Sequence, residues 1–364
     1  MKKLGLLLGV VLVGVVVAFT YFYFEYAVHH SISYVWTTWF NSNTTRWLVV
    51  PLCVVISLIF FGTQHLLDPA SENHESHGLG EAPKPTIANF ATLLFVGFFS
   101  LLAGASLGPE AILVPACMIA GGYIGSKLFS DARLTKLLSM AGFIALFTAF
   151  FHSFIAGMLG LLLVKKQTKL QLKPVIILVA AIASATTYYV LKIIDASAYL
   201  RLPENSWNFN LKHILGLAIL VGAGYGAIFV LGRLHNAFSI VHDRFKGQNW
   251  VVKSLVASLG LSTLYLLGGN LVEFTGNESI VPMLSRAASL GFIGLAWIMV
   301  VKLAAIGWSK TLGYRGGMIF PTIFVASVLV AILQLYMKDI NFIFGLVAVL
   351  IGAFAADKKV KILI

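Results

Sequence analysis

The sequence predicts an all-α, polytopic membrane protein with about 10 to 11 tilted and partly penetrating helices. Of its 364 residues, 59% are hydrophobic and only 11% are charged. Soluble domains carry about 25% charged residues, so a soluble fold is excluded. Apolar segments recur along the whole chain, and none of them alternates with a period of two, which argues against a β-barrel.

The apolar segments differ in length, although a spanning helix needs about 20 apolar residues. Several are shorter than this and one is longer, which predicts tilted and partly penetrating helices that neighbouring protein must shield. The many glycines inside these segments favour close helix packing. The segments lie at residues 4–24, 47–67, 87–103, 111–125, 137–164, 174–193, 213–232, 251–268, 288–307, 318–336 and 341–356.

The N-terminus begins with Met1, Lys2 and Lys3, and an apolar run follows over residues 4–20. This run is too long for the apolar core of a signal peptide, and no small-residue cleavage pattern follows it. We therefore interpret residues 1–30 as a retained membrane helix whose N-terminus is cytoplasmic.

The loops indicate the topology, because basic loops stay on the cytoplasmic side. Loops 165–173 and 233–253 are basic and are predicted to be cytoplasmic, whereas 268–287 carries acidic residues and is predicted to face outward. This pattern accounts for the formal net charge of +12 without a nucleic-acid partner. The lipid bilayer is the expected surrounding. We predict a single membrane-embedded transport domain over 1–364, with half-repeats at roughly 47–193 and 213–356.

Two glycine-rich segments interrupt the apolar chain in the same way. The first glycine segment runs from Gly104 to Glu110 and the second from Gly313 to Pro321. Each contains glycines and a proline before an apolar run, which predicts a turn followed by the N-terminus of a helix. Helix N-termini present free amides and a positive dipole end, so paired segments of this kind indicate an anion transport site. The alternative is a pair of ordinary turns.

The candidate pore residues share a position at or beside these two helix starts. Among them Glu110 favours a functional role, since a carboxylate inside the membrane is costly unless it faces a pore or a partner. Lys302, inside an apolar segment, is a candidate for the electric field of the anion path, or it extends to the interface. The pore candidates are Ser106, Leu107, Gly108, Pro109, Glu110, Gly316, Gly317, Met318, Ile319, Phe320 and Pro321.

Other chemistry has little support. Cys53 and Cys117 lie in apolar segments without metal-ligand spacing and are interpreted as buried thiols. The loop 68–77 carries acids and histidines at irregular spacing, which favours a solvated loop over a metal site, and His152 is interpreted as a hydrogen-bonded core residue. No phosphate-binding loop, nucleophile elbow or carboxylate pair occurs, so no enzymatic activity, metal or cofactor is expected.

The two glycine segments resemble the motifs of a known family. The run from Val301 to Pro321 is similar to the segment of ClC chloride channels and transporters that ends in their G-x-F-x-P motif, and 106–109 resembles the end of their G-K/R-E-G-P motif. Residues 154–164 resemble the helix between these motifs. The resemblance covers roughly residues 50 to 356.

The resemblance implies an inverted-repeat ClC-like fold and a homodimer in which each subunit has its own path for chloride or another small anion. It also implies that backbone amides hold the anion at the middle of the bilayer. By position, Ser106, Leu107 and Gly108 would serve an outer site, and Met318 and Ile319 a central one.

Several positions depart from the family pattern. Leu107 stands where the family has its gating glutamate, and Val164 falls near the internal proton-accepting glutamate of the antiporters. Ile319 takes the place of the motif phenylalanine, and only a faint echo of G-S-G-I-P occurs at 78–83. The chain stops at Ile364, before the family's last helices, which suggests a C-terminal truncation.

These departures favour passive or loosely coupled anion permeation in a bacterial plasma membrane, because proton transfer through an apolar region needs a titratable group or a water chain. Two alternatives stay open. One is a proton-coupled antiporter of chloride or fluoride that uses Glu110, and the other is a degenerate membrane scaffold that transports nothing.

Overall fold

A computed structural model describes residues 2–37, 46–68, 84–168, 173–200, 202–203 and 213–363, with the backbone alone described at Lys2 and over 162–168. Helices account for most of these residues, and the described part of the chain contains no strand. The α-helices are α1 Lys2–Ile32, α2 Val49–Leu67, α3 Ile87–Leu102, α4 Glu110–Leu128, α5 Ala132–Phe151, α6 Phe154–Thr168, α7 Pro174–Ile193, α8 Ile214–Phe245, α9 Trp250–Gly268, α10 Ile280–Ser285, α11 Ala287–Thr311, α12 Ile319–Gln334 and α13 Phe342–Val360. A π-helical turn, η1 Ser33–Thr37, follows α1, and a 3-10 turn, η2 Arg46–Leu48, precedes α2.

Most predicted segments are confirmed to within a few residues, and α7 matches its segment in full. The segment predicted at 137–164 is wrong as a single element, because it forms two helices, α5 and α6. The break lies at His152, which caps α5 in the left-handed conformation with φ of 47°. The His152 ring contacts Tyr188 edge-on, with the ring centroids 5.6 Å apart.

Two helices continue well past their predicted ends, since polar residues after the apolar run are compatible with helix. α1 extends to Ile32 and α8 extends to Phe245. Eight of the described helical segments are long and apolar enough to span a membrane, as judged by length and composition. The helices α3 and α12 are shorter apolar helices of 16 residues each.

The chain divides into two compact units that alternate along the sequence. Unit 1 comprises 1–32, 79–98 and 111–200, and unit 2 comprises 33–78, 99–110 and 201–364. In unit 1, helices α1, α5, α6 and α7 pack against one another. A single transport domain built from two half-repeats stays a prediction.

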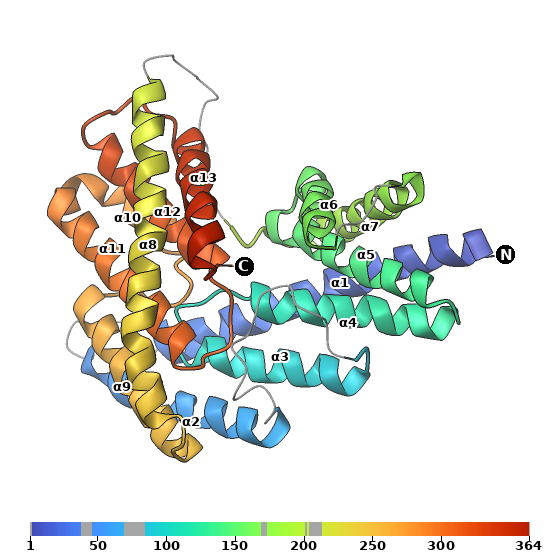
Figure 1. Ribbon diagram of the computed structural model, residues 1–364, viewed down its shortest axis with the longest axis horizontal. Helices are drawn as coiled ribbons and strands as arrows, with labels where there is room; N and C mark the ends of the chain where they lie inside the picture. The colour runs from blue at the N-terminus through green and yellow to red at the C-terminus, as the bar shows by residue number, and fades with distance from the viewer. Residues whose placement is uncertain are drawn as a thin grey trace. The chain divides into compact units, whose positions relative to one another are not determined.

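Unit 2 contains both glycine segments. In this unit α13 packs along α8 (Figure 1), while α11 packs against α8, α9 and α12. Glycines make the contact between α8 and α13 close: a Cβ atom at Gly224 would collide with the carbonyl of Val349, and one at Gly352 with the carbonyl of Val221. This backbone-to-backbone packing agrees with the predicted role of glycine in these helices.

Candidate anion-binding site

The first glycine segment connects α3 to α4 and is buried over its whole length. Gly104 has a φ of +96°, a left-handed conformation that glycine adopts without steric cost. Helix α4 begins at Glu110, one residue after the predicted start at Pro109. The segment therefore places a carboxylate in the first turn of a helix.

The second glycine segment connects α11 to α12 and also opens on a left-handed glycine, Gly313, with a φ of +92°. Helix α12 begins at Ile319, next to the predicted start at Met318. From Tyr314 to Met318 the connecting residues are buried. The sequence prediction of a turn followed by a helix start is confirmed in both segments.

The two segments are joined by a reciprocal pair of backbone hydrogen bonds. The Gly108 amide donates to the Gly317 carbonyl over 2.8 Å, and the Gly317 amide donates back to the Gly108 carbonyl over 2.8 Å. A Cβ atom at either glycine would collide with the carboxyl group of Glu110. Both glycines are thus required for space, because the Glu110 side chain lies against them.

The Glu110 carboxylate lies at the N-terminus of α12. Its Oε1 accepts hydrogen bonds from the amides of Ile319, over 2.7 Å, and Phe320, over 3.4 Å. Pro321 has no amide hydrogen, and Thr322 already donates within the helix. Ile319 and Phe320 therefore form an inner amide site, at the positive end of the helix dipole, and a carboxylate of the protein itself occupies it.

The other oxygen of Glu110 is isolated. The residue is only 7% exposed, and its Oε2 is buried without a hydrogen-bond partner. A buried carboxylate in an apolar segment is costly, and an oxygen left without a partner adds to that cost. This geometry favours a role for Glu110 in function over one in packing.

Two amides predicted for an outer anion site bond within the protein. The Ser106 amide donates to the hydroxyl of Ser309 over 3.0 Å, and the Gly108 amide donates to Gly317 as described above. The first glycine segment is held by these bonds, and its contribution to the inner amide site is the Glu110 side chain.

Leu107 and Gly316 are both buried. Leu107 is 0% exposed, and its carbonyl accepts a hydrogen bond from the Thr275 hydroxyl over 2.7 Å. Met318 precedes α12 in the capping position and makes no side-chain cap. The assignment of these residues to a pore stays a prediction.

Lys302 is 0% exposed and lies in α11. Its ammonium group donates to the carbonyls of Val272, over 3.0 Å, and Phe274, and it lies 5.3 Å from the ring centre of Phe324. Burial raises the pKa of the adjacent Glu273 to about 7, against the opposing charges of Arg46 and Lys302. The bonds of Lys302 thus hold the segment that follows α9.

Phe274 of that segment is hydrogen-bonded to the first glycine segment, a contact that the sequence does not predict. The Phe274 carbonyl also accepts from the Ser106 hydroxyl over 3.1 Å, and its amide donates to the Tyr265 hydroxyl over 2.9 Å. Tyr265 in turn donates to the Gly104 carbonyl. Phe274 has a φ of +53°, which is strained for a residue other than glycine. No motif in the sequence signals these contacts.

Arg315, in the second glycine segment, is 8% exposed. Its guanidinium Nη2 donates to the Asp68 carboxylate over 2.7 Å, and its backbone amide donates to the Ser100 hydroxyl over 2.8 Å. Tyr314 beside it bonds to the Ser57 hydroxyl of α2 over 2.6 Å. The second glycine segment is therefore anchored to α2 and α3.

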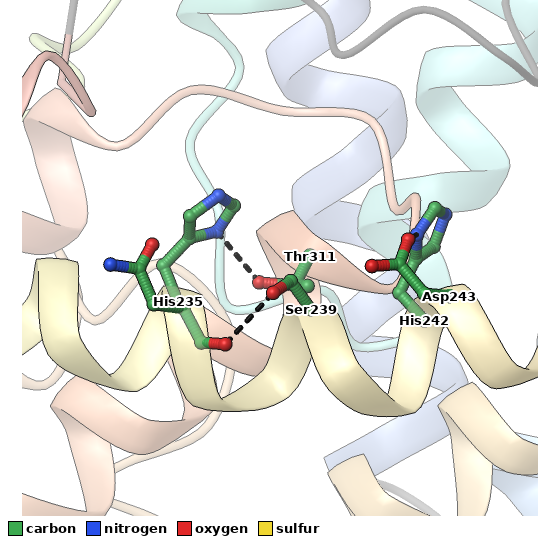
Figure 2. A network of polar contacts seen from close by, with 6 residues as sticks. His235, Ser239, His242, Asp243 and Thr311 are labelled. Atoms are coloured by element: carbon green, nitrogen blue, oxygen red, sulfur yellow. Dashed lines mark hydrogen bonds and ion pairs between the residues drawn. The ribbon is translucent and has the colours of Figure 1, made fainter.

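A further polar cluster lies at the end of α8 (Figure 2). The Thr311 hydroxyl donates to the Gly307 carbonyl over 2.7 Å, so its contact of 2.8 Å with His235 requires that His235 Nδ1 be the donor. His242 and Asp243 form a separate exposed pair at 3.4 Å. The cluster joins α8 to α11. Among the described residues, no group of three or more metal-ligating side chains occurs.

Several predictions fall on parts of the chain that are not described. The candidate metal loop after Asp68 and the segment 78–83 lie outside the described residues, and the side chain of Val164 does as well. Cys53 and Cys117 are buried free thiols, as predicted.

Comparison with known proteins extends these observations. The sequence model of a family described as voltage gated chloride channel matches residues 74–357. The protein YfeO of Salmonella typhimurium, provisionally named an ion-transport protein, is 31% identical over 123 residues. This match covers 34% of the present chain and 28% of YfeO, so it spans less than a third of that relative.

Solved structures share the fold. A slow cyanobacterial Cl-/H+ antiporter is similar with a TM-score of 0.76 at 15% identity, covering 97% of this chain and 85% of that one. A CLC-type fluoride/proton antiporter has a TM-score of 0.69 at 17% identity, covering 99% of this chain and 87% of that one. At these identities the likeness establishes the fold alone. With the family match over most of its length, the protein is an integral membrane protein that belongs to the voltage-gated chloride channel family.

Proposed function

We propose that the chain conducts small anions, with chloride as the expected ion, through a bacterial plasma membrane along a path that passes the inner amide site. The observation that carries this proposal is the Glu110 carboxylate on the amides of Ile319 and Phe320. A site that accepts a carboxylate oxygen on helix-terminal amides also accepts a halide, because both are anions that bind N–H donors. A permeating anion replaces the side chain.

Passive or loosely coupled permeation is the simpler mode. Leu107 has neither charge nor exchangeable proton, so it cannot act as a proton gate. The homodimeric assembly and the cytoplasmic N-terminus remain part of this proposal, supported by the family and by the basic loops.

Proton-coupled exchange of chloride or fluoride is a second candidate, and Glu110 favours it. Its Oε2 is buried without a partner, so a proton there would neutralise the carboxylate and weaken its hold on the α12 amides. Two structures of similar fold come from proteins described as a Cl-/H+ and a fluoride/proton antiporter.

Flux from purified protein in liposomes tests both modes. We expect chloride to leave loaded liposomes at a rate that depends on the protein, and Glu110→Gln to leave anion flux present. Uphill proton movement driven by a chloride gradient, abolished in Glu110→Gln, would establish exchange and exclude passive permeation. Asp243→Asn, at an exposed site in α8, is the matched control. Absence of any anion flux from folded protein would instead favour a scaffold.

A further inference from the structure

The guanidinium group of Arg315 lies at one end of the second glycine segment. Arg315 is four residues before Ile319, so the Cα atoms of these two residues are at most about 14 Å apart. Its partner Asp68 directly follows α2, whose candidate membrane span ends at Leu67. The Arg315–Asp68 pair thus lies where a membrane-spanning helix gives way to polar sequence.

The guanidinium retains an unused donor. Nη2 donates to Asp68, whereas Nη1 is buried and has no hydrogen-bond partner. The side chain is nine-tenths buried, with 9% of its surface exposed. Leaving a charged donor buried and unbonded is costly, so this position favours a ligand that accepts hydrogen bonds.

The two members of the ion pair differ in access to water. The Asp68 side chain is 25% exposed, compared with 9% for Arg315. Water therefore reaches the carboxylate more readily than the guanidinium, while the cation is held by its burial and by the Ser100 contact with its backbone. Asp68 is the replaceable member of the pair.

We propose that Arg315 forms an entrance subsite for a small inorganic anion such as a halide, in which the anion bonds to the unused Nη1 donor and to Nη2, where it displaces Asp68. This inference rests on the proposed function and adds a second exchange step to it. An anion first replaces Asp68 on Arg315 and then replaces Glu110 on the inner amide site. In both places a carboxylate of the protein occupies the position of the anion. Asp68 is the more exposed of the two carboxylates.

Bromide, located by its anomalous X-ray scattering in crystals of the full chain, tests the subsite directly. We expect bromide beside Arg315 in the wild type, at higher occupancy in Asp68→Asn, and absent from Arg315→Gln. Arg244→Gln, which removes an exposed charge from α8, should retain it. No bromide at Arg315 in either the wild type or Asp68→Asn would overturn the proposal, and Asp68→Asn decides the matter if Arg315→Gln does not fold.

Chloride flux separates this proposal from the proposed function. Arg315→Gln should lower flux by about tenfold at low chloride, the loss of one charge-assisted hydrogen bond, and much less at saturating chloride. An equal loss at all concentrations would indicate a structural role and contradict the subsite. Bromide bound at Arg315 in a protein without flux would support the subsite and refute the proposed transport. Chloride flux without bromide at Arg315 would support the proposed transport and refute the subsite.

Discussion

The two glycine segments look alike in sequence but contribute different groups to the site. The first, Gly104–Glu110, uses its amides internally and supplies a carboxylate, whereas the second, Gly313–Pro321, supplies the helix-terminal amides that this carboxylate binds. One segment thus acts as a built-in anion and the other as its receptor. A symmetric motif pair in sequence does not require a symmetric site.

The contact between Gly317 and Glu110 leaves no room for a larger side chain. Gly317→Ala would place a Cβ atom inside the Glu110 carboxyl group, so the carboxylate must leave the α12 amides. Unlike removal of the carboxylate, this change leaves both the new Cβ atom and the displaced carboxyl group beside the α12 amides, where they fill the space for an anion. We therefore expect transport to be lost and the protein to be destabilised by about 1–3 kcal/mol through overpacking. Thermal unfolding in detergent and liposome flux measure both effects.

Gly222→Ala is the matched control, since nothing lies within 4 Å of a Cβ atom there. It should preserve flux and leave stability unchanged or slightly higher. If Gly317→Ala behaved like this control, the packing of Glu110 between the two segments would be refuted.

Removing the Glu110 carboxylate should leave the inner amide site open to anions. Glu110→Ala deletes the group that accepts from Ile319 and Phe320, so anions no longer compete with a tethered charge. We expect chloride flux to rise by about tenfold to a hundredfold, the equivalent of a charge-assisted hydrogen bond. Glu278→Ala, at an exposed site, should leave the rate unchanged. Unchanged or lower flux in folded Glu110→Ala would contradict competition.

The support behind the first segment depends on Lys302. Lys302→Met leaves the carbonyl of Val272 without its ammonium donor, which should cost about 1–3 kcal/mol of stability. Thermal unfolding of this variant measures the loss, with Lys246→Met on the exposed end of α8 as control. Equal stability of the two variants would show that the segment holds its position without Lys302.

A smaller, pH-dependent effect is expected from Glu273. Its pKa rises from 4.5 to about 7 on burial, so its contribution to stability is fully present below 4.5 and is lost as the pH rises through about 7. Glu273→Gln should flatten the fall in melting temperature across this interval. The exposed Glu278→Gln should keep the wild-type slope. A steeper fall in melting temperature with pH in Glu273→Gln would contradict a raised pKa of Glu273 in the folded protein.

The sequence predicts the helices and both helix starts because apolar length and Gly-Pro turns are local signals. It does not predict the break at His152, where neither glycine nor proline occurs and the left-handed cap is set by packing. It also leaves the direction of Glu110 open, since its partners lie 209 and 210 residues away. The partners of Lys302 lie 30 and 28 residues away and are backbone carbonyls, which no sequence pattern marks. From the sequence alone, a lysine in an apolar segment therefore suggests a role in the pore.

Chloride binding to purified protein, measured by isothermal titration calorimetry, tests the central claim that Glu110 occupies an anion site at the start of α12. The account predicts that Glu110→Ala binds chloride about tenfold or more tightly than the wild type, because the competing carboxylate is gone. Equal or weaker chloride binding by folded Glu110→Ala would contradict it.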